Sequence, residues 1–137
     1  MREFVVYGTP VAKGRPKFKR TGNFVQTYTP EKTANYETLV KTEYMQKYGG
    51  EPFLNGAIAA AITAYFPIPK STSKRKRNLM LSDHIRHTKK PDCDNIAKCV
   101  LDALNNVAYA DDSSVCILMV KKLYAEEPQV EITLTEI

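Results

Sequence analysis

The sequence predicts an α+β fold in which a mixed β-sheet of about four strands is packed by two main helices. Two segments, residues 30–48 and 94–105, show apolar residues at helical spacing together with start and stop signals. Around them lie short runs that are rich in β-branched and aromatic residues, which favours strands. With 137 residues and 43% hydrophobic content, the chain has the size of a single domain, residues 1–137.

The first third of the chain predicts a strand, a basic loop and a long helix. Residues 2–7 end in Phe-Val-Val-Tyr before a Gly-Thr-Pro turn, which is typical of a strand. Residues 11–29 contain five basic residues and no acidic one, with glycine and proline between them, and predict an irregular loop. A helix over residues 30–48 begins with Pro30 and Glu31, because proline suits the first turn and an acid suits the positive end of the helix dipole.

The middle of the chain predicts the centre of the sheet and a second basic segment. Residues 57–66 are rich in Ile, Thr and aromatic residues and end at prolines, which favours a buried strand. Residues 70–90 hold eight basic residues and one acid. We expect this segment to be a loop as a whole, with a short helix within residues 71–82.

The last third of the chain predicts a helix followed by a β-hairpin. After a proline, Asp92 or Asp94 can cap a helix whose apolar residues recur up to Asn105. Residues 115–124 and 129–135 are typical of strands. The turn residues between these two strands predict that they pair with each other as a C-terminal hairpin.

Basic and acidic residues are distributed unevenly along the chain. Residues 1–90 carry 17 Lys and Arg and 6 Asp and Glu, residues 91–137 carry 3 and 9, and the net charge is +5. Clustered Lys and Arg supply the phosphate contacts that dominate nucleic-acid affinity, although short basic runs also occur as solvated surface. The candidate DNA-binding residues are Lys13, Arg15, Lys17, Lys19, Arg20, Lys74, Arg75, Lys76, Arg77, Lys89 and Lys90.

A small acidic cluster stands out in this basic chain. On the predicted second helix, Asp94, Lys98 and Asp102 are four residues apart and share one face. An antiparallel return after the helix would bring Asp112 back toward Asp92 and Asp94. Carboxylate oxygens are the ligands that Mg²⁺ prefers, so these residues are candidates for a metal-dependent site that cleaves phosphodiesters. The alternative is structural: the acids cap the helix or form a solvated turn, and the lysine makes ordinary ion pairs along the helix.

Other residues exclude several classes of protein. The three cysteines form no CxxC pair and the N-terminus lacks a secretory apolar core, so we expect a reduced, cytoplasmic protein. Cys93 and Cys116 are expected to be small buried residues. His84 and His87 do not have the spacing of zinc fingers. The longest apolar run is too short to span a bilayer, so no membrane role is predicted.

Two stretches of the chain carry a specific pattern of residues. The first is Lys90-Pro91-Asp92-Cys93-Asp94-Asn95 with Lys98 and Asp102-Ala103-Leu104, followed by Ala108-Tyr109-Ala110-Asp111-Asp112 and Val115. The second is the Gly14-Arg15-Pro16-Lys17 loop with the helix start Tyr28-Thr29-Pro30-Glu31-Lys32. Together they closely resemble the RusA family of Holliday-junction resolvases, and the second stretch resembles the phage- and prophage-borne members. The likeness covers most of the chain.

This resemblance implies a homodimeric crossover junction endodeoxyribonuclease that depends on Mg²⁺, with Mn²⁺ as an alternative metal. Such an enzyme nicks two opposed strands of a four-way DNA junction symmetrically, in DNA recombination or repair. The residues that match the family's catalytic, metal-holding acids are Asp92, Asp94 and Asp112, and Lys98 matches its essential lysine.

Some points stay open after the sequence is read. Asp102 and Asp111 match acidic positions of the family pattern without a defined role, Asn106 stands where glycine is frequent, and Ser114 where glutamine is frequent. Two other functions also fit: a metal-dependent nuclease of branched or flap DNA, and a catalytically silent module that binds junction DNA. Cleavage of a synthetic four-way junction, and the symmetry of the nicks, would separate the three.

Overall fold

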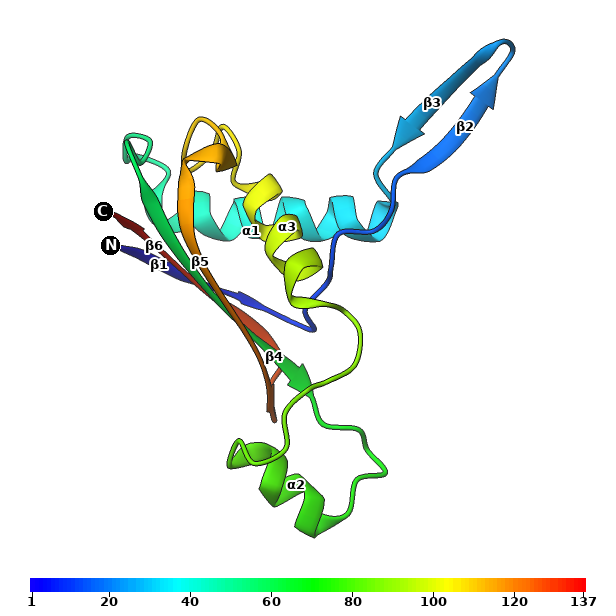
Figure 1. Ribbon diagram of the computed structural model, residues 1–137, viewed down its shortest axis with the longest axis vertical. Helices are drawn as coiled ribbons and strands as arrows, with labels where there is room; N and C mark the ends of the chain where they lie inside the picture. The colour runs from blue at the N-terminus through cyan, green and yellow to red at the C-terminus, as the bar shows by residue number, and fades with distance from the viewer.

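A four-stranded mixed sheet with helices packed on it forms the body of the computed structural model, which describes all residues 1–137 (Figure 1). The α+β fold predicted from the sequence is therefore confirmed. In chain order the elements are β1 (Arg2–Tyr7), β2 (Lys17–Thr21), β3 (Phe24–Tyr28), α1 (Glu31–Tyr48), β4 (Ile58–Pro67), α2 (Lys74–Leu81), α3 (Cys93–Ala103), the 3-10 turn η1 (Asp112–Ser114), β5 (Val115–Ala125) and β6 (Gln129–Glu136).

The strand β4 lies inside the sheet, as the sequence predicts. The strand order is β1-β6-β4-β5, with β5 parallel to β4 on one edge and β6 antiparallel on the other. Residues of β4 alternate between buried and half-buried from Ile58 to Phe66, because one face of the sheet meets the helices. Buried residues of β1, β4, β6, α1 and α3 together form the hydrophobic core.

The predicted C-terminal hairpin is wrong, because β5 and β6 do not pair with each other. The strand β4 lies between them and takes hydrogen bonds from both. Neighbouring strands are about 4.8 Å apart, so β5 and β6 are about 10 Å apart, which the three residues 126–128 can span. Pairing on both edges satisfies the backbone N–H and C=O groups of β4, the most apolar strand. A hairpin of β5 with β6 would leave these groups unpaired along one edge of β4.

Part of residues 11–29, predicted to be an irregular loop, forms a two-stranded antiparallel hairpin that projects from the body (Figure 1). Strands β2 and β3 meet at a two-residue turn, Gly22-Asn23, and Gly22 has a φ of 60°. A positive φ at this position matches the right-handed twist of a tight hairpin. We call residues 17–28 the arm; every residue in it is exposed.

The helices α1 and α3 begin and end close to the predicted positions. The helix α1 buries Tyr36, Val40 and Tyr44, and the ring of Tyr44 packs edge-on against Phe4 with 5.5 Å between the ring centres. The short helix α2 falls within the basic segment as predicted, and its N-cap Ser73 accepts a hydrogen bond from the Lys76 N–H group.

The cysteines are not placed as predicted. Cys93 and Cys116 are exposed, because Cys93 lies in the first turn of α3 and Cys116 lies on the edge strand β5. Cys99 is the buried cysteine, on the core face of α3, and burial raises the pKa of its thiol to about 12. None of the helices is both long and apolar enough to cross a membrane.

Candidate active site

Two carboxylates at the start of α3 are open to solvent and have no partner in the chain. Asp92 is the N-cap residue of α3, but its side chain makes no capping hydrogen bond. Asp94 follows in the first turn, and both residues are exposed. The structural alternative, in which the side chain of Asp92 caps the helix with a hydrogen bond, is therefore not what the structure shows. Unpaired exposed carboxylate oxygens are available to bind a cation.

The lysine of the predicted site is also exposed and unpaired. Lys98 lies one turn after Asp94 on the solvent side of α3, between the buried residues Ala97 and Cys99. It makes none of the ion pairs of the chain, so the expected pairs along the helix with Asp94 and Asp102 do not form. Its ammonium group stays free for a ligand.

The loop after α3 fixes the position of Asp112. The main-chain N–H of Asp112 donates to Asn105 Oδ1 at 2.8 Å, and the buried hydroxyl of Tyr109 donates to the carbonyl of Leu101 at 2.7 Å. Asn106 has a φ of 58°, a left-handed conformation that glycine adopts freely and asparagine tolerates. This explains why asparagine fits at this position.

Asp112 lies beside Asp102, near the end of α3. The pKa of Asp112 is raised, first by partial burial, then by the negative charges of Asp111 and Asp102 and by a hydrogen bond with Asp102. Asp94 is eight residues before Asp102, or about 12 Å along the helix axis. The return of the chain thus reaches the far half of α3, and Asp112 does not close a compact cluster with Asp92 and Asp94.

The fit of these residues to a divalent metal can be judged from their chemistry. Among residues 1–137, no three His, Cys, Asp or Glu side chains are grouped closely enough to hold a metal ion. The donors are nevertheless hard carboxylate oxygens, as Mg²⁺ prefers. The pKa of Asp112 is raised first by partial burial and then by the negative charges of Asp111 and Asp102, and a bound cation would offset those charges.

Lys13, a predicted DNA-binding residue, is engaged inside the protein. Its ammonium lies 3.1 Å from Glu37 Oε1 on α1 and 3.3 Å from Asp102 Oδ2 on α3, and its side chain is only 19% exposed. Its main-chain N–H donates to the carbonyl of Asn95 at 3.0 Å. Burial lowers the pKa of Lys13. The hydrogen bonds and charges of Glu37 and Asp102 raise it by more than burial lowers it, so the pKa lies above its usual value.

The segment that leads into Asp92 is tied to β5 by Lys122. The Lys122 ammonium donates to the carbonyl oxygens of Lys89 at 2.6 Å and Pro91 at 2.9 Å. Close by, the ring of His87 stacks on Phe66 with 3.8 Å between ring centres, and burial, then Lys122 and Lys89, lower its pKa. Sequence reasoning missed Lys122, because only the parallel pairing of β4 with β5 brings it to this segment.

A polar groove lies next to Asp92, between the segment that leads to the arm, the start of α1 and the start of α3. Its volume is about 570 Å³. Its charged lining residues are Arg15, Lys32, Lys90 and Asp92, and the Asn95 side chain lies with them. Neither Lys32 nor Asn95 was predicted from the sequence to be a site residue. The Pro-Glu-Lys helix start contained Lys32, but nothing in the sequence showed that this end of α1 faces Asp92.

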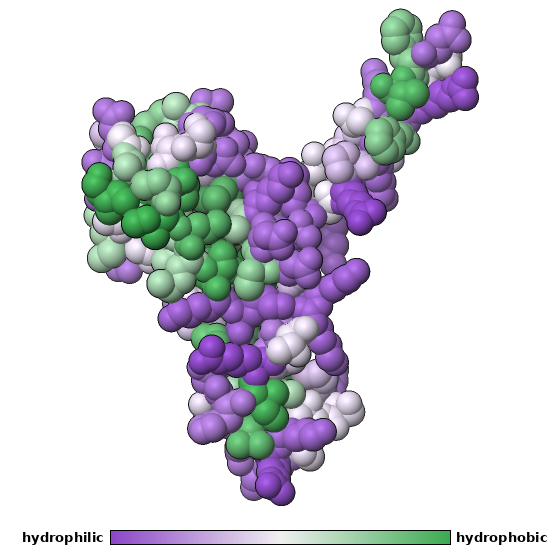
Figure 2. Space-filling model, in the orientation of Figure 1, coloured by the Kyte–Doolittle hydropathy of each residue, from purple (hydrophilic) through white to green (hydrophobic).

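The remaining predicted DNA-binding residues are distributed over the arm and the far end of the molecule (Figures 1 and 2). Lys17, Lys19 and Arg20 are exposed on β2, and the side chains of Phe18 on β2 and of Phe24 and Val25 on β3 are exposed as well. The residues Lys74, Arg75, Lys76 and Arg77 belong to α2. Of these four, Arg77 pairs with Glu126 at 3.3 Å. Lys89 and Lys90 are exposed just before Asp92.

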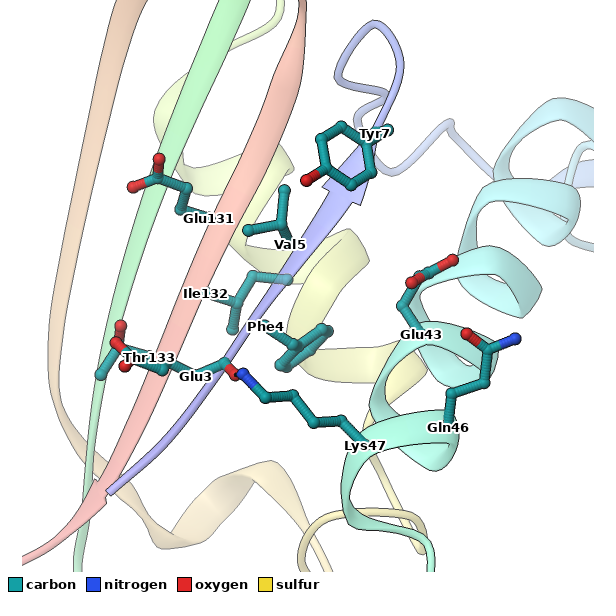
Figure 3. Close-up of a pocket in the computed structure, with 10 residues that line it drawn as sticks. All are labelled: Glu3, Phe4, Val5, Tyr7, Glu43, Gln46, Lys47, Glu131, Ile132 and Thr133. Carbon is teal, nitrogen blue, oxygen red and sulfur yellow. Dashed lines mark hydrogen bonds between the residues drawn. The ribbon is translucent and has the colours of Figure 1, made fainter.

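A second cavity, of about 510 Å³, lies between α1 and strands β1 and β6 (Figure 3). Its lining includes the carboxylates of Glu3, Glu43 and Glu131, and it shares no residue with the groove at Asp92. The Lys47 ammonium in this cavity donates to the main-chain oxygen of Glu3 at 2.7 Å. Because three carboxylates repel phosphate, this cavity is not suited to nucleic acid.

Comparison with known proteins gives a consistent likeness along the whole chain. Residues 7–135 match the protein family described as Endodeoxyribonuclease RusA. The chain is 39% identical over 137 residues to the uncharacterized protein YqaN of Bacillus subtilis (strain 168), covering 98% of this chain and 96% of that protein. It is 27% identical over 137 residues to the crossover junction endodeoxyribonuclease rusA of Lactococcus phage r1t, with the same 98% and 96% coverage. The likeness thus includes the arm, the groove and the carboxylates.

Proposed function

Since the chain belongs to the Endodeoxyribonuclease RusA family, we propose that it is a Mg²⁺-dependent enzyme that resolves four-way DNA junctions by symmetric paired nicks. The observation that carries this proposal is the pair of open, unpartnered carboxylates at the start of α3, one of which lines a groove with three basic residues. Carboxylates for a metal and cations for phosphates are thereby placed next to one another.

Three acids are proposed to hold the metal: Asp92 and Asp94, which are open at the start of α3, and Asp112, which would have to move toward them from its position beside Asp102. When bound, Mg²⁺ supplies positive charge that stabilises the phosphodiester in its transition state and acidifies a water molecule; Mn²⁺ can replace it. Asp92 and Asp94 need no change of partner to bind a cation, because neither carboxylate is engaged. The Lys98 ammonium, exposed one turn after Asp94, is proposed to neutralise charge on the phosphate or on the leaving oxygen.

Symmetric cutting requires two active sites related by a two-fold axis, so we propose that the enzyme is a homodimer. The strand β5 favours an interface, because it pairs with β4 on one edge only and leaves its outer edge without a partner. Ile117, Leu118 and Met119 on this strand are 55%, 47% and 54% exposed. A long apolar edge strand is a template for pairing with a second chain. The buried tyrosines of α1, in contrast, belong to the core.

The proposal is tested with a synthetic four-way junction, labelled on each strand in turn, incubated with the protein and Mg²⁺. Paired nicks at opposed positions support a junction resolvase, and cuts without symmetry on branched or flap substrates would indicate the more general nuclease. Replacing Asp92, Asp94 or Asp112 by Asn should abolish cleavage and preserve junction binding, because Asn keeps the shape and removes the charge. Junction binding without any metal-dependent cleavage would refute the enzymatic function.

A further inference from the structure

The groove at Asp92 brings together three basic side chains that have no partner in the chain. Arg15, Lys32 and Lys90 line it, and none of them takes part in an ion pair of the structure. Lys13, two residues before Arg15, is fully engaged by Glu37 and Asp102. The contrast separates a basic residue used for folding from basic residues left open for a ligand.

Specific contacts hold the three walls of this groove at close range. The Gly14 N–H donates to Thr33 Oγ1 at 3.0 Å, and Thr33 is only 2% exposed. A Cβ atom on Gly14 would lie 3.0 Å from Pro30 Cγ and from Thr33 Oγ1, so a larger residue here would have to push the arm segment and α1 slightly apart. The third wall is joined by the bond from the Lys13 N–H to the carbonyl of Asn95.

Holding three positive charges in one groove costs free energy unless an anion is bound there. The one acid in the lining, Asp92, is proposed to hold the metal, so the cations are not balanced from within. A volume of about 570 Å³ falls in the range of small-molecule sites and exceeds what a single ion needs. Unpaired cations around a polar groove of this size are the arrangement that recognises a nucleotide phosphate.

We propose that this groove binds the DNA backbone next to the cleaved bond, with Lys32 and Arg15 each contacting a different phosphate close to the scissile one. The inference rests on the proposed function, because it takes Asp92 to mark the cut site. The groove then sets which phosphodiester reaches the carboxylates, whereas the arm and α2 only add affinity. Lys32, from the first turn of α1, thus becomes a specificity-determining residue of the site.

The first test compares Lys32→Ala with Lys41→Ala. Both lysines are exposed on α1, and Lys41 lines neither cavity. Junction affinity is measured in EDTA, which prevents cleavage, over a series of salt concentrations. Lys32→Ala should bind several-fold more weakly and lower the slope of log K against log salt by about 0.9, the contribution of one phosphate. Lys41→Ala should match the wild type in both quantities. Equal behaviour of the two variants would overturn the proposal.

The second test locates the phosphate on the substrate. Junctions are prepared with one neutral methylphosphonate at each position around the branch point. One position should weaken wild-type binding and leave Lys32→Ala binding unchanged, because the contact is already lost in that variant. If the effects of Lys32→Ala and of every methylphosphonate simply add, Lys32 does not contact a defined phosphate and the proposal fails. These binding tests do not need cleavage, so their result is independent of whether the wild type resolves junctions.

Discussion

Replacing Lys13 by Met should destabilise the protein and slow cleavage, and should leave the salt dependence of DNA binding unchanged. The Lys13 ammonium lies between Glu37 and Asp102, whose side chains are 18% and 25% exposed. Methionine keeps most of the length of the side chain and removes its charge. Two partly buried carboxylates then lose their counter-ion.

The magnitude follows from the burial of this ion triad. Surface ion pairs contribute about 0 to 1 kcal/mol, and loss of a hydrogen-bonded partner of a buried charge costs about 1 to 3 kcal/mol or more. The low exposure of the three side chains places the cost near 1 to 3 kcal/mol, or a decrease in Tm of roughly 3 to 10 °C for a chain of this size. Cleavage slows because Asp102, now without Lys13, adds its charge next to Asp112.

The pH dependence gives an independent check of the same reasoning. The pKa of Lys13 is raised on folding above its ordinary value of 10.5, so the folded state holds this proton more tightly than the unfolded chain. The stabilisation is complete below the unfolded pKa and is lost as pH rises through the folded one. The difference in Tm between wild type and Lys13→Met should therefore stay constant around pH 7 to 9 and shrink above about pH 10.5.

A matched control is Arg15→Met, two residues along the same segment. Arg15 is exposed and lines the groove without an ion pair, so its loss should leave Tm nearly unchanged and flatten the salt slope of DNA binding by about 0.9. Thermal unfolding followed by circular dichroism and junction binding in EDTA measure both quantities. If Lys13→Met showed the unchanged Tm and the flattened slope instead, Lys13 would be a DNA contact and the internal role would be refuted.

Three further predictions concern the acids, the loop before α3 and the interface. Asp112→Asn should raise Tm at pH 7, because folding raises the pKa of this carboxyl, and the gain should disappear in acid, where the wild-type carboxyl is protonated. Lys122→Met should reduce the single-turnover cleavage rate more than junction affinity, since Lys122 positions the carbonyls before Asp92; equal losses in both would contradict this. Leu118→Lys should shift light scattering toward a monomer and convert paired nicks into single ones, and an unchanged dimer would exclude β5 from the interface.

The elements with strong local signals could be predicted from the sequence. The helix α1 has a proline at its start and glycines at its end, and β4 is apolar over its whole length, so both were found within a few residues. The arm was missed although Gly22-Asn23 between aromatic and β-branched residues is a hairpin signal, because the many charges of the segment suggested an open loop. The sequence could not show that β5 and β6 each pair with β4 instead of with each other, because the strand order is decided by the packing of the whole sheet.

The sequence predicted which residues belong to the candidate site, but it did not predict how they are arranged in space. Asp92, Asp94 and Lys98 lie where helical spacing places them. The two acids are exposed at the start of α3, and Lys98 is exposed on its solvent side. Lys13 looked like every other basic residue of its segment, since the sequence does not show that Glu37 and Asp102 converge on it. Lys32 and Lys122 were missed for the same reason: each acts on a segment more than thirty residues away in the chain.

The ion triad also bears on the open role of Asp102. A carboxylate that already binds Lys13 at 3.3 Å must give up that partner before it can bind a metal, and the cost of doing so is the stability that Lys13→Met would remove. Asp92 and Asp94 pay no such cost, because they have no partner to lose. Asp102 is thus better suited to hold the arm segment against α3 through Lys13 than to act as a metal ligand. Since the main-chain N–H of Lys13 also binds Asn95, this single residue fixes the distance between the base of the arm and the turn of α3 that carries Asp94.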